Sequence, residues 1–123
     1  MERATRQAQY AVSLPNADES VKVLVTHSMT ETERSVPDEM QRVDRVKTVR
    51  RVNELLTEAG VEHEVRELSS PPEENIVELA EAEAVDEIVM GGRKRSPAEK
   101  LLLGSVTQSV IRNVDVPVVV TGG

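Results

Sequence analysis

The sequence predicts an α/β domain built on an open parallel sheet with helices on both faces. Apolar runs of strand length, at residues 22–26, 85–90 and 116–121, alternate with longer stretches that have helical periodicity. These runs are too continuously apolar for a sheet with one face in water, so we expect helices on both sides of the strands. In open sheets of this class, ligands bind where the carboxyl ends of the strands lie.

The first half of the chain is expected to form a helix, a strand, a second helix and an edge strand. Residues 2–14 carry small apolar side chains on one stripe, which is typical of an amphipathic helix, and Pro15 ends it. After the first strand and a polar loop, a long helix is predicted to begin at Asp38 and to stop at Gly60. The alternating pattern at residues 61–65 predicts a half-exposed edge strand.

The second half of the chain repeats this alternation. Ser70 and Glu73 form a capping box around a proline at the first helical position, which predicts the start of a third helix. Residues 85–90 predict a buried strand, and a further helix is predicted to begin near Gly104. The last apolar run, from Val116 to Thr121, completes the predicted sheet.

Length and composition limit the classes of protein to which the chain can belong. A chain of 123 residues predicts a single domain, and with no Phe or Trp its core must be aliphatic. The absence of Cys excludes disulfides and thiolate metal sites. A net charge of −7 argues against non-specific nucleic-acid binding. No apolar run reaches the ~20 residues of a membrane span and no secretory signal follows Met1, so we expect a soluble cytoplasmic protein.

A glycine-rich and basic segment follows the third predicted strand. It runs from Gly91 through the basic triplet at residues 93–95 to Gly104, beyond which a helix begins. A helix N-terminus presents backbone N–H groups and the positive end of its dipole to an anion, and Gly104 lets a ligand approach the backbone. Ser105 and Thr107 add hydroxyl donors. The segment is therefore a candidate phosphate site.

A simpler interpretation remains open for the same residues. Ser105 can cap the helix, with Gln108 completing a capping box, while the basic loop is only solvated. Composition alone favours this interpretation, because short glycine patterns are common. No metal site or catalytic set is indicated elsewhere. His27 and His63 lack further ligands at suitable spacing, and we expect both to be hydrogen-bonded structural residues or surface residues.

The glycine-rich segment resembles the signature of the universal stress protein family, G-x2-G-x9-G-[ST], which follows the fourth strand of that fold. Gly91 matches the first glycine, Gly104 the last, and Ser105 the Ser/Thr position. Lys94 stands where the second glycine belongs. The run Leu-Leu-Leu-Gly-Ser-Val and the ending Asp-Val-Pro-Val-Val-Val are also similar to the family's usual sequence. The resemblance implies a flavodoxin-like fold of the adenine-nucleotide-hydrolase type.

The same resemblance implies a stress-response protein that binds ATP or a related adenine nucleotide, with any Mg or Mn ion carried by the nucleotide. We expect no enzymatic activity beyond slow ATP hydrolysis. Carried over position by position, the family's nucleotide contacts fall on Met90, Gly91, Arg93, Lys94, Gly104, Ser105, Val106 and Thr107, with Thr26 on the adenine side. Lys94 either contacts a phosphate as a point charge or obstructs the close approach that a glycine would allow.

The start of the chain departs from the family pattern. Members of the family begin with a central strand that ends in an Asp contacting the nucleotide, whereas this chain opens in the first helix. We therefore expect one domain over residues 1–123 that is shortened at its N-terminus and lacks both the central strand and the Asp. Either the start is truncated or this variant is rearranged.

Two further expectations concern assembly and alternative function. Many members of the family dimerise through the last strand, so the resemblance implies a homodimer through the strand from Val116 to Thr121. An alternative is a dimeric regulatory module of the same fold that binds no nucleotide. We set aside a phospho-receiver domain, because it requires a Lys after the last strand, where this chain has Gly122. No G-x4-G-K-[ST] motif occurs, so a Walker-type nucleotidase is set aside as well.

Overall fold

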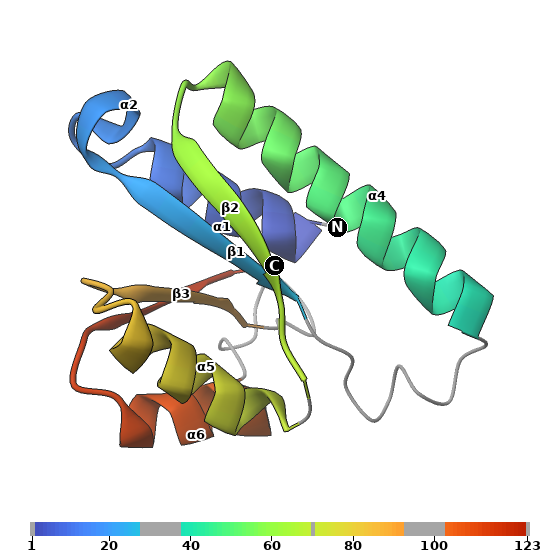
Figure 1. Cartoon of the computed structure of the whole chain (residues 1–123), viewed down its shortest axis with the longest axis vertical. Coiled ribbons are helices and arrows are strands. Elements are labelled where there is room, and N and C mark those ends of the chain that lie inside the picture. Colours follow the sequence, from blue (N-terminus) through green and yellow to red (C-terminus); the bar gives the residue numbers. More distant parts are fainter. Residues whose placement is uncertain (1, 28–37, 70, 93–102, 123) are drawn as a thin grey trace.

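The computed structural model of the chain describes residues 2–27, 38–69, 71–92 and 103–122. Helices and strands alternate through these ranges, which confirms the predicted α/β class (Figure 1). The elements are α1 (Glu2–Val12), α2 (Ala17–Ser20), β1 (Lys22–His27), α4 (Asp38–Glu58), β2 (Glu62–Glu67), α5 (Pro72–Ala82), β3 (Ile88–Gly91), α6 (Ser105–Asn113) and β4 (Val118–Thr121).

The strands form two parallel pairs. In one pair β1 lies beside β2, with Val25 opposite Val65, and in the other β3 lies beside β4, with Met90 opposite Val120. Within the described residues no strand joins β1 to β3. All four strands run in the same direction, so their carboxyl ends lie toward the same side of the molecule (Figure 1).

Helices cover the strands from two sides. Helix α1 packs against α4 and also contacts β3 and β4, while α5 packs against α6. The α1–α4 pair and the α5–α6 pair lie on opposite sides of the strands (Figure 1). This arrangement confirms the predicted helices on both faces.

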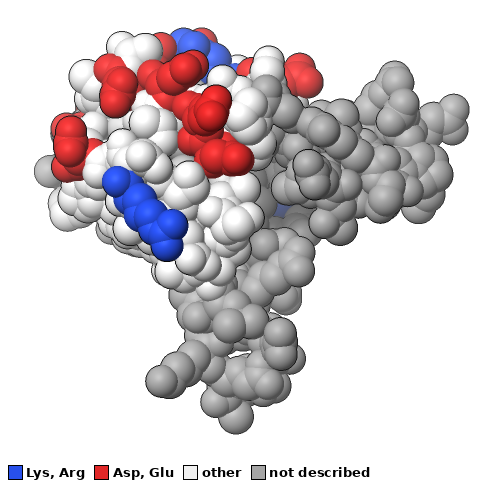
Figure 2. Space-filling view, turned by 90° about the horizontal axis from the view of Figure 1, so that it is seen from below, with Lys and Arg blue, Asp and Glu red and all other residues white. Residues whose placement is uncertain are grey.

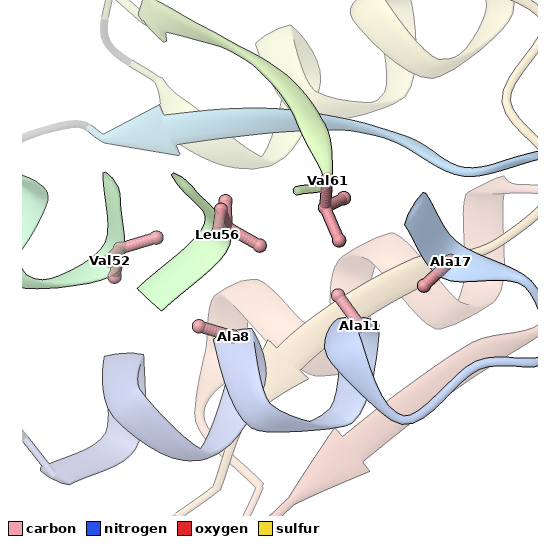
Figure 3. Packing of buried hydrophobic residues seen from close by; sticks show 6 residues of the cluster. All are labelled: Ala8, Ala11, Ala17, Val52, Leu56 and Val61. Carbon is pink, nitrogen blue, oxygen red and sulfur yellow. The ribbon is translucent and has the colours of Figure 1, made fainter. Parts of the chain in front are cut away.

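The main buried cluster is aliphatic, as the composition requires. It lies between α1 and α4, where Leu56 is fully buried and Val61, the residue before β2, is 3% exposed. Side chains from α1, α4 and the residue before β2 point toward one another in this cluster (Figure 3). Its members are Ala8, Ala11, Ala17, Val52, Leu56 and Val61. Alanine on α1 allows that helix to approach α4 closely, since there is little side chain between them.

The end of α4 confirms the predicted stop at Gly60. Gly60 has φ +72°, a left-handed conformation that glycine adopts without steric cost. The N–H of Gly60 donates to the carbonyl of Thr57 at 3.0 Å, and the N–H of Val61 donates to the carbonyl of Leu56 at 2.9 Å. This pair of bonds is a Schellman motif, which satisfies carbonyls that the helix end would otherwise leave without partners.

Some predicted boundaries were wrong by a few residues. Helix α1 ends at Val12 and not at residue 14, because the residue before Pro15 is disfavoured in helical conformation. The short α2 was not predicted, and it follows Asn16 in a left-handed conformation with φ +55°. Helix α5 begins at Pro72, one residue later than the capping-box pattern predicts, and Ser70 lies outside the described residues.

The two strands predicted to be buried are only half-buried. Val23 and Val25 in β1 and every residue of β3 keep partial exposure. The physical reason is that each of these strands has a neighbour on one edge, and its other edge faces a cavity. Strand β2 was predicted to alternate between buried and exposed residues, yet Val65 is 38% exposed.

Candidate functional site

The carboxyl end of β3 is tied to β4. The N–H of Gly92 donates to the carbonyl of Thr121 at 2.8 Å, and the Thr121 hydroxyl lies 3.4 Å from the carbonyl of Met90, to which it donates. Gly91 is the last residue of β3, and Gly92 is buried. These bonds fix the backbone of Met90 and Gly91 at the strand end. Thr121 was not among the predicted site residues. Its position at the end of the last predicted strand could have indicated that it lies near the end of β3.

The N-terminus of α6 has the geometry of an anion site. Gly104 is the N-cap, with extended backbone angles of φ −72° and ψ 169°. The first bond of the helix runs from the N–H of Gln108 to the carbonyl of Gly104, at 3.1 Å. The N–H groups of Ser105, Val106 and Thr107 precede that bond, so helix geometry leaves them available to an acceptor. A Cβ added at Gly104 would meet nothing within 4 Å among the described residues, so there is open space beside the N-cap.

The predicted capping box is wrong. Ser105 is the first residue inside α6 and not its cap, and no side-chain bond caps the helix. The side-chain amide of Gln108 donates to the carbonyl of Leu103 at 3.0 Å instead of completing a box. The exposed Ser105 hydroxyl is therefore not needed to begin the helix. Thr107 differs from it, because its side chain is buried with 4% exposure.

The remaining predicted site residues that the structure describes lie on three elements, β3, α6 and β1. Met90 and Gly91 lie at the end of β3, and Val106 is half-buried in the first turn of α6. Thr26 is exposed on β1, opposite Arg66 of β2, and so belongs to the other strand pair. Arg93 and Lys94 lie outside the described residues.

A cavity of about 710 Å³ separates β1 from β3. Its walls include Val23 and Val25 of β1 and Ile88 and Val89 of β3, and side chains of α1, α4 and α5 close it on both faces of the sheet. No residue of β2 or β4 lines it. The cavity therefore occupies the place between the two strand pairs.

Two polar atoms at this cavity are buried without a partner among the described residues. They are Nδ1 of His27, at the end of β1, and Oε1 of Glu87, just before β3. The prediction that His27 is hydrogen-bonded is therefore wrong for Nδ1, whereas His63 Nδ1 lies 2.9 Å from the carbonyl of Val61 as expected. Partial burial raises the pKa of Tyr10, and the hydrogen bond and charge of Glu87 raise it further.

Charges elsewhere form a surface network and not a compact site. Arg66 Nε lies 2.7 Å from Glu64 Oε1 and Arg66 Nη2 lies 3.0 Å from Glu83 Oε1, so the network joins β2 to the end of α5. The hydrogen bond from Arg66 lowers the pKa of Glu64, with a smaller contribution from Lys22. Acidic side chains gather on the face seen from below (Figure 2). The described residues contain no group of three His, Asp or Glu that could hold a metal ion.

No helix in the described ranges has the length and apolar character that crossing a bilayer would require.

Comparison with known proteins identifies a family. Residues 2–122 match the sequence model of the universal stress protein family. A universal stress protein of Methanocaldococcus jannaschii is 35% identical over 82 residues, which make up 67% of this chain and 48% of that protein. A stress response protein of Bacillus subtilis is 31% identical over 85 residues, 68% of this chain and 51% of that protein. The chain thus spans about half the length of these curated relatives.

Solved structures show the same fold. A universal stress protein from Archaeoglobus fulgidus is 32% identical with a TM-score of 0.75, covering 98% of this chain and 90% of that one. A second structure from that organism, a universal stress protein in complex with dAMP, is 27% identical with a TM-score of 0.70, covering 98% of this chain and 88% of that one.

Proposed function

Because the chain belongs to the universal stress protein family, we propose that it binds ATP or a related adenine nucleotide at the end of β3 and the beginning of α6. One observation carries the proposal: three N–H groups precede the first bond of α6, and a Cβ added at the N-cap Gly104 would meet nothing within 4 Å among the described residues. An anionic phosphate fits such a position, since the donors and the helix dipole both favour negative charge. The relative solved with dAMP supports an adenine nucleotide as the ligand.

The proposed contacts divide between the phosphates and the rest of the nucleotide. The N–H groups of Ser105, Val106 and Thr107, together with the exposed Ser105 hydroxyl, receive the phosphate and ribose. The backbone of Met90 and Gly91 forms the strand side of the site, and Thr26 is proposed for the adenine side. Arg93 and Lys94 would add positive charge, and any Mg or Mn ion arrives with the nucleotide. None of these residues is assigned a catalytic role.

A homodimer through β4 is part of the same proposal. In the described part of the chain β4 pairs only with β3, so its other edge carries backbone groups without strand partners. Val118, Val119 and Val120 on this strand are half-buried. A two-fold axis would let two copies of β4 pair through that edge and form a closed dimer. The same edge also fits the alternative function, a dimeric regulatory module of the cytoplasm that needs no nucleotide.

Calorimetry with ATP separates these two functions. We expect ATP to bind the wild-type protein and Gly104→Val to weaken binding at least about tenfold, because the branched side chain would fill the open space. Ser109→Ala, one helical turn further along α6, is the matched control and should bind as the wild type does. Circular dichroism should show the same helix content in all three proteins. No ATP binding by the wild type would favour the nucleotide-free module, and equal affinity in Gly104→Val would move the site elsewhere.

A further inference from the structure

The N-cap of α6 has no side chain that could support the helix start. Gly104 holds extended backbone angles of φ −72° and ψ 169°, and no side-chain bond caps the helix. An N-cap Ser, Thr, Asn or Asp usually accepts a bond from the N–H of the second or third helical residue, which here are Val106 and Thr107. Glycine leaves both donors free, yet its backbone is the least restricted of any residue. The conformation of this cap therefore depends on bonds made by other residues.

Gln108 makes two such bonds from the fourth position of the helix. Its backbone N–H donates to the carbonyl of Gly104 at 3.1 Å, and its side-chain Nε2 donates to the carbonyl of Leu103 at 3.0 Å. Side chains of a helix lean toward its N-terminus, so Gln108 reaches the carbonyl that lies just outside the cap. Both bonds use carbonyl acceptors. Gln108 thus holds the cap without occupying any N–H group of the first turn.

The carbonyl of Leu103 and the N–H of Gly104 belong to one peptide unit. A trans peptide unit is planar, so its N–H points in the direction opposite to its C=O. The side chain of Gln108 holds this carbonyl toward itself, and the Gly104 N–H therefore points away from Gln108. Gly104 is exposed, and within the described residues no backbone bond uses its N–H. Gln108 therefore fixes the direction of one further donor beside the first turn.

We propose that Gln108 is a positioning residue that turns the Gly104 N–H toward the phosphate of the bound nucleotide, an inference that rests on the proposed function. The phosphate then receives the successive backbone N–H groups of residues 104–107 and not only those of the first turn. Successive N–H groups make a concave anion site, and a bond to a charged acceptor is stronger than one to a neutral acceptor. Without the side-chain donor of Gln108, the Leu103–Gly104 peptide is free to rotate and the additional donor is lost.

The substitution Gln108→Met tests this role. Methionine has a similar length and a similar helix propensity but no donor, and Gln108 is exposed, so the fold should be kept. We expect calorimetry to show ATP binding about three- to tenfold weaker than in the wild type, which is the effect of about one hydrogen bond. Gln9→Met makes the same change at an exposed residue of α1 and should bind ATP as the wild type does.

NMR signals separate positioning from simple support of the helix. Without nucleotide, the carbonyl carbon signal of Leu103 should move upfield in Gln108→Met, because that carbonyl loses its donor. With saturating ATP, the Gly104 amide should shift in the wild type and much less in the variant, while the amides of residues 105–107 shift in both. A residue that only supports the helix would instead reduce all of these amide shifts together and lower the helix content in circular dichroism.

Each contrary result has a distinct meaning. The absence of ATP-dependent shifts at residues 104–107 of the wild type would remove the proposed site, and this inference with it. Wild-type shifts at these residues, combined with equal affinity and an equal Gly104 shift in Gln108→Met, would leave the proposed function standing and overturn the role of Gln108. An unmoved carbonyl signal of Leu103, or a uniform loss of shifts at residues 104–107, would overturn that role as well.

Discussion

The N–H of Gly92 donates to the carbonyl of Thr121 at 2.8 Å, one residue beyond the last pair of the β3–β4 ladder. This bond uses the Gly92 donor, so that N–H is not available to a phosphate. Within the described residues, the first turn of α6 provides N–H groups that precede the first bond of that helix. The end of β3 therefore serves as a fixed wall of the proposed site, while α6 supplies the donors.

Ala84→Gly should stabilise the protein. Ala84 has φ +49° where the chain leaves α5, and the N–H of Val85 donates to the carbonyl of Ala80 at 3.2 Å, as in the Schellman motif at Gly60. A left-handed conformation costs a residue with a Cβ roughly 1–2 kcal/mol, so we expect a gain of about 1 kcal/mol in urea unfolding. The control Ala82→Gly, at the last residue of α5, should instead lose about 0.5–1 kcal/mol. A loss in Ala84→Gly would contradict the assigned conformation.

Leu56→Ala should be severely destabilising. Leu56 is fully buried between α4 and α1, and the surrounding cluster has no aromatic side chain that could move to fill a void. Truncation of a buried Leu costs about 2–5 kcal/mol in chemical denaturation. Leu103→Ala removes the same atoms at a residue with 38% exposure and should change stability by about 0.5 kcal/mol or less. Equal losses at the two positions would show that Leu56 is not in the core.

Arg66→Gln should raise the pKa of Glu64. The lowered pKa means that the ion pair stabilises the fold above the ordinary carboxyl pKa of about 4.3, and that this stabilisation is lost as pH falls through the lowered value. NMR titration of the Glu64 carboxyl should show only a partial rise, because Lys22 Nζ remains 3.6 Å from it. Arg51→Gln removes a pair with Glu54 and should leave Glu64 unchanged. An unaltered Glu64 pKa in Arg66→Gln would contradict the assigned pair.

Val119→Lys should shift the proposed dimer to monomer. The change places a charge in the middle of β4, at the edge through which two copies would pair. Light scattering at tens of micromolar protein, on the order of weak-dimer affinities, should show the loss of the dimer mass. Val65→Lys adds the same charge to an exposed residue of β2 and should leave the mass unchanged. A wild-type protein that is already monomeric under these conditions would rule out this interface.

The sequence was sufficient to predict the class of the fold and most of its elements. Gly60 illustrates why: a long amphipathic stretch followed by glycine requires only local backbone chemistry to end a helix, and the structure shows that end. Ser105 illustrates the limit of the same approach. Gly104 and Ser105 are both acceptable caps, so the sequence does not decide which residue caps the helix, and in the structure the cap is Gly104.

Features that depend on contacts between residues far apart in the sequence could not be predicted from it. The half-burial of β3 follows from the cavity on one of its edges, which apolar periodicity cannot reveal. The lack of a hydrogen-bond partner at His27 Nδ1 could not be predicted either, because it depends on the same cavity. Thr121 contacts Met90 across 31 residues of sequence, a relationship that no local pattern shows. Of the proposed site, the glycines and the helix start were predictable, and the supporting bonds were not.

An NMR titration of the wild-type protein with ATP tests the proposed function most directly. If the nucleotide binds in front of α6, the amide signals of Ser105, Val106 and Thr107 should shift saturably, because their N–H groups would become donors to phosphate. The Gly92 amide should shift less, since its N–H already bonds to Thr121. Shifts confined to other parts of the chain, or none at about 1 mM ATP, would contradict the proposed site.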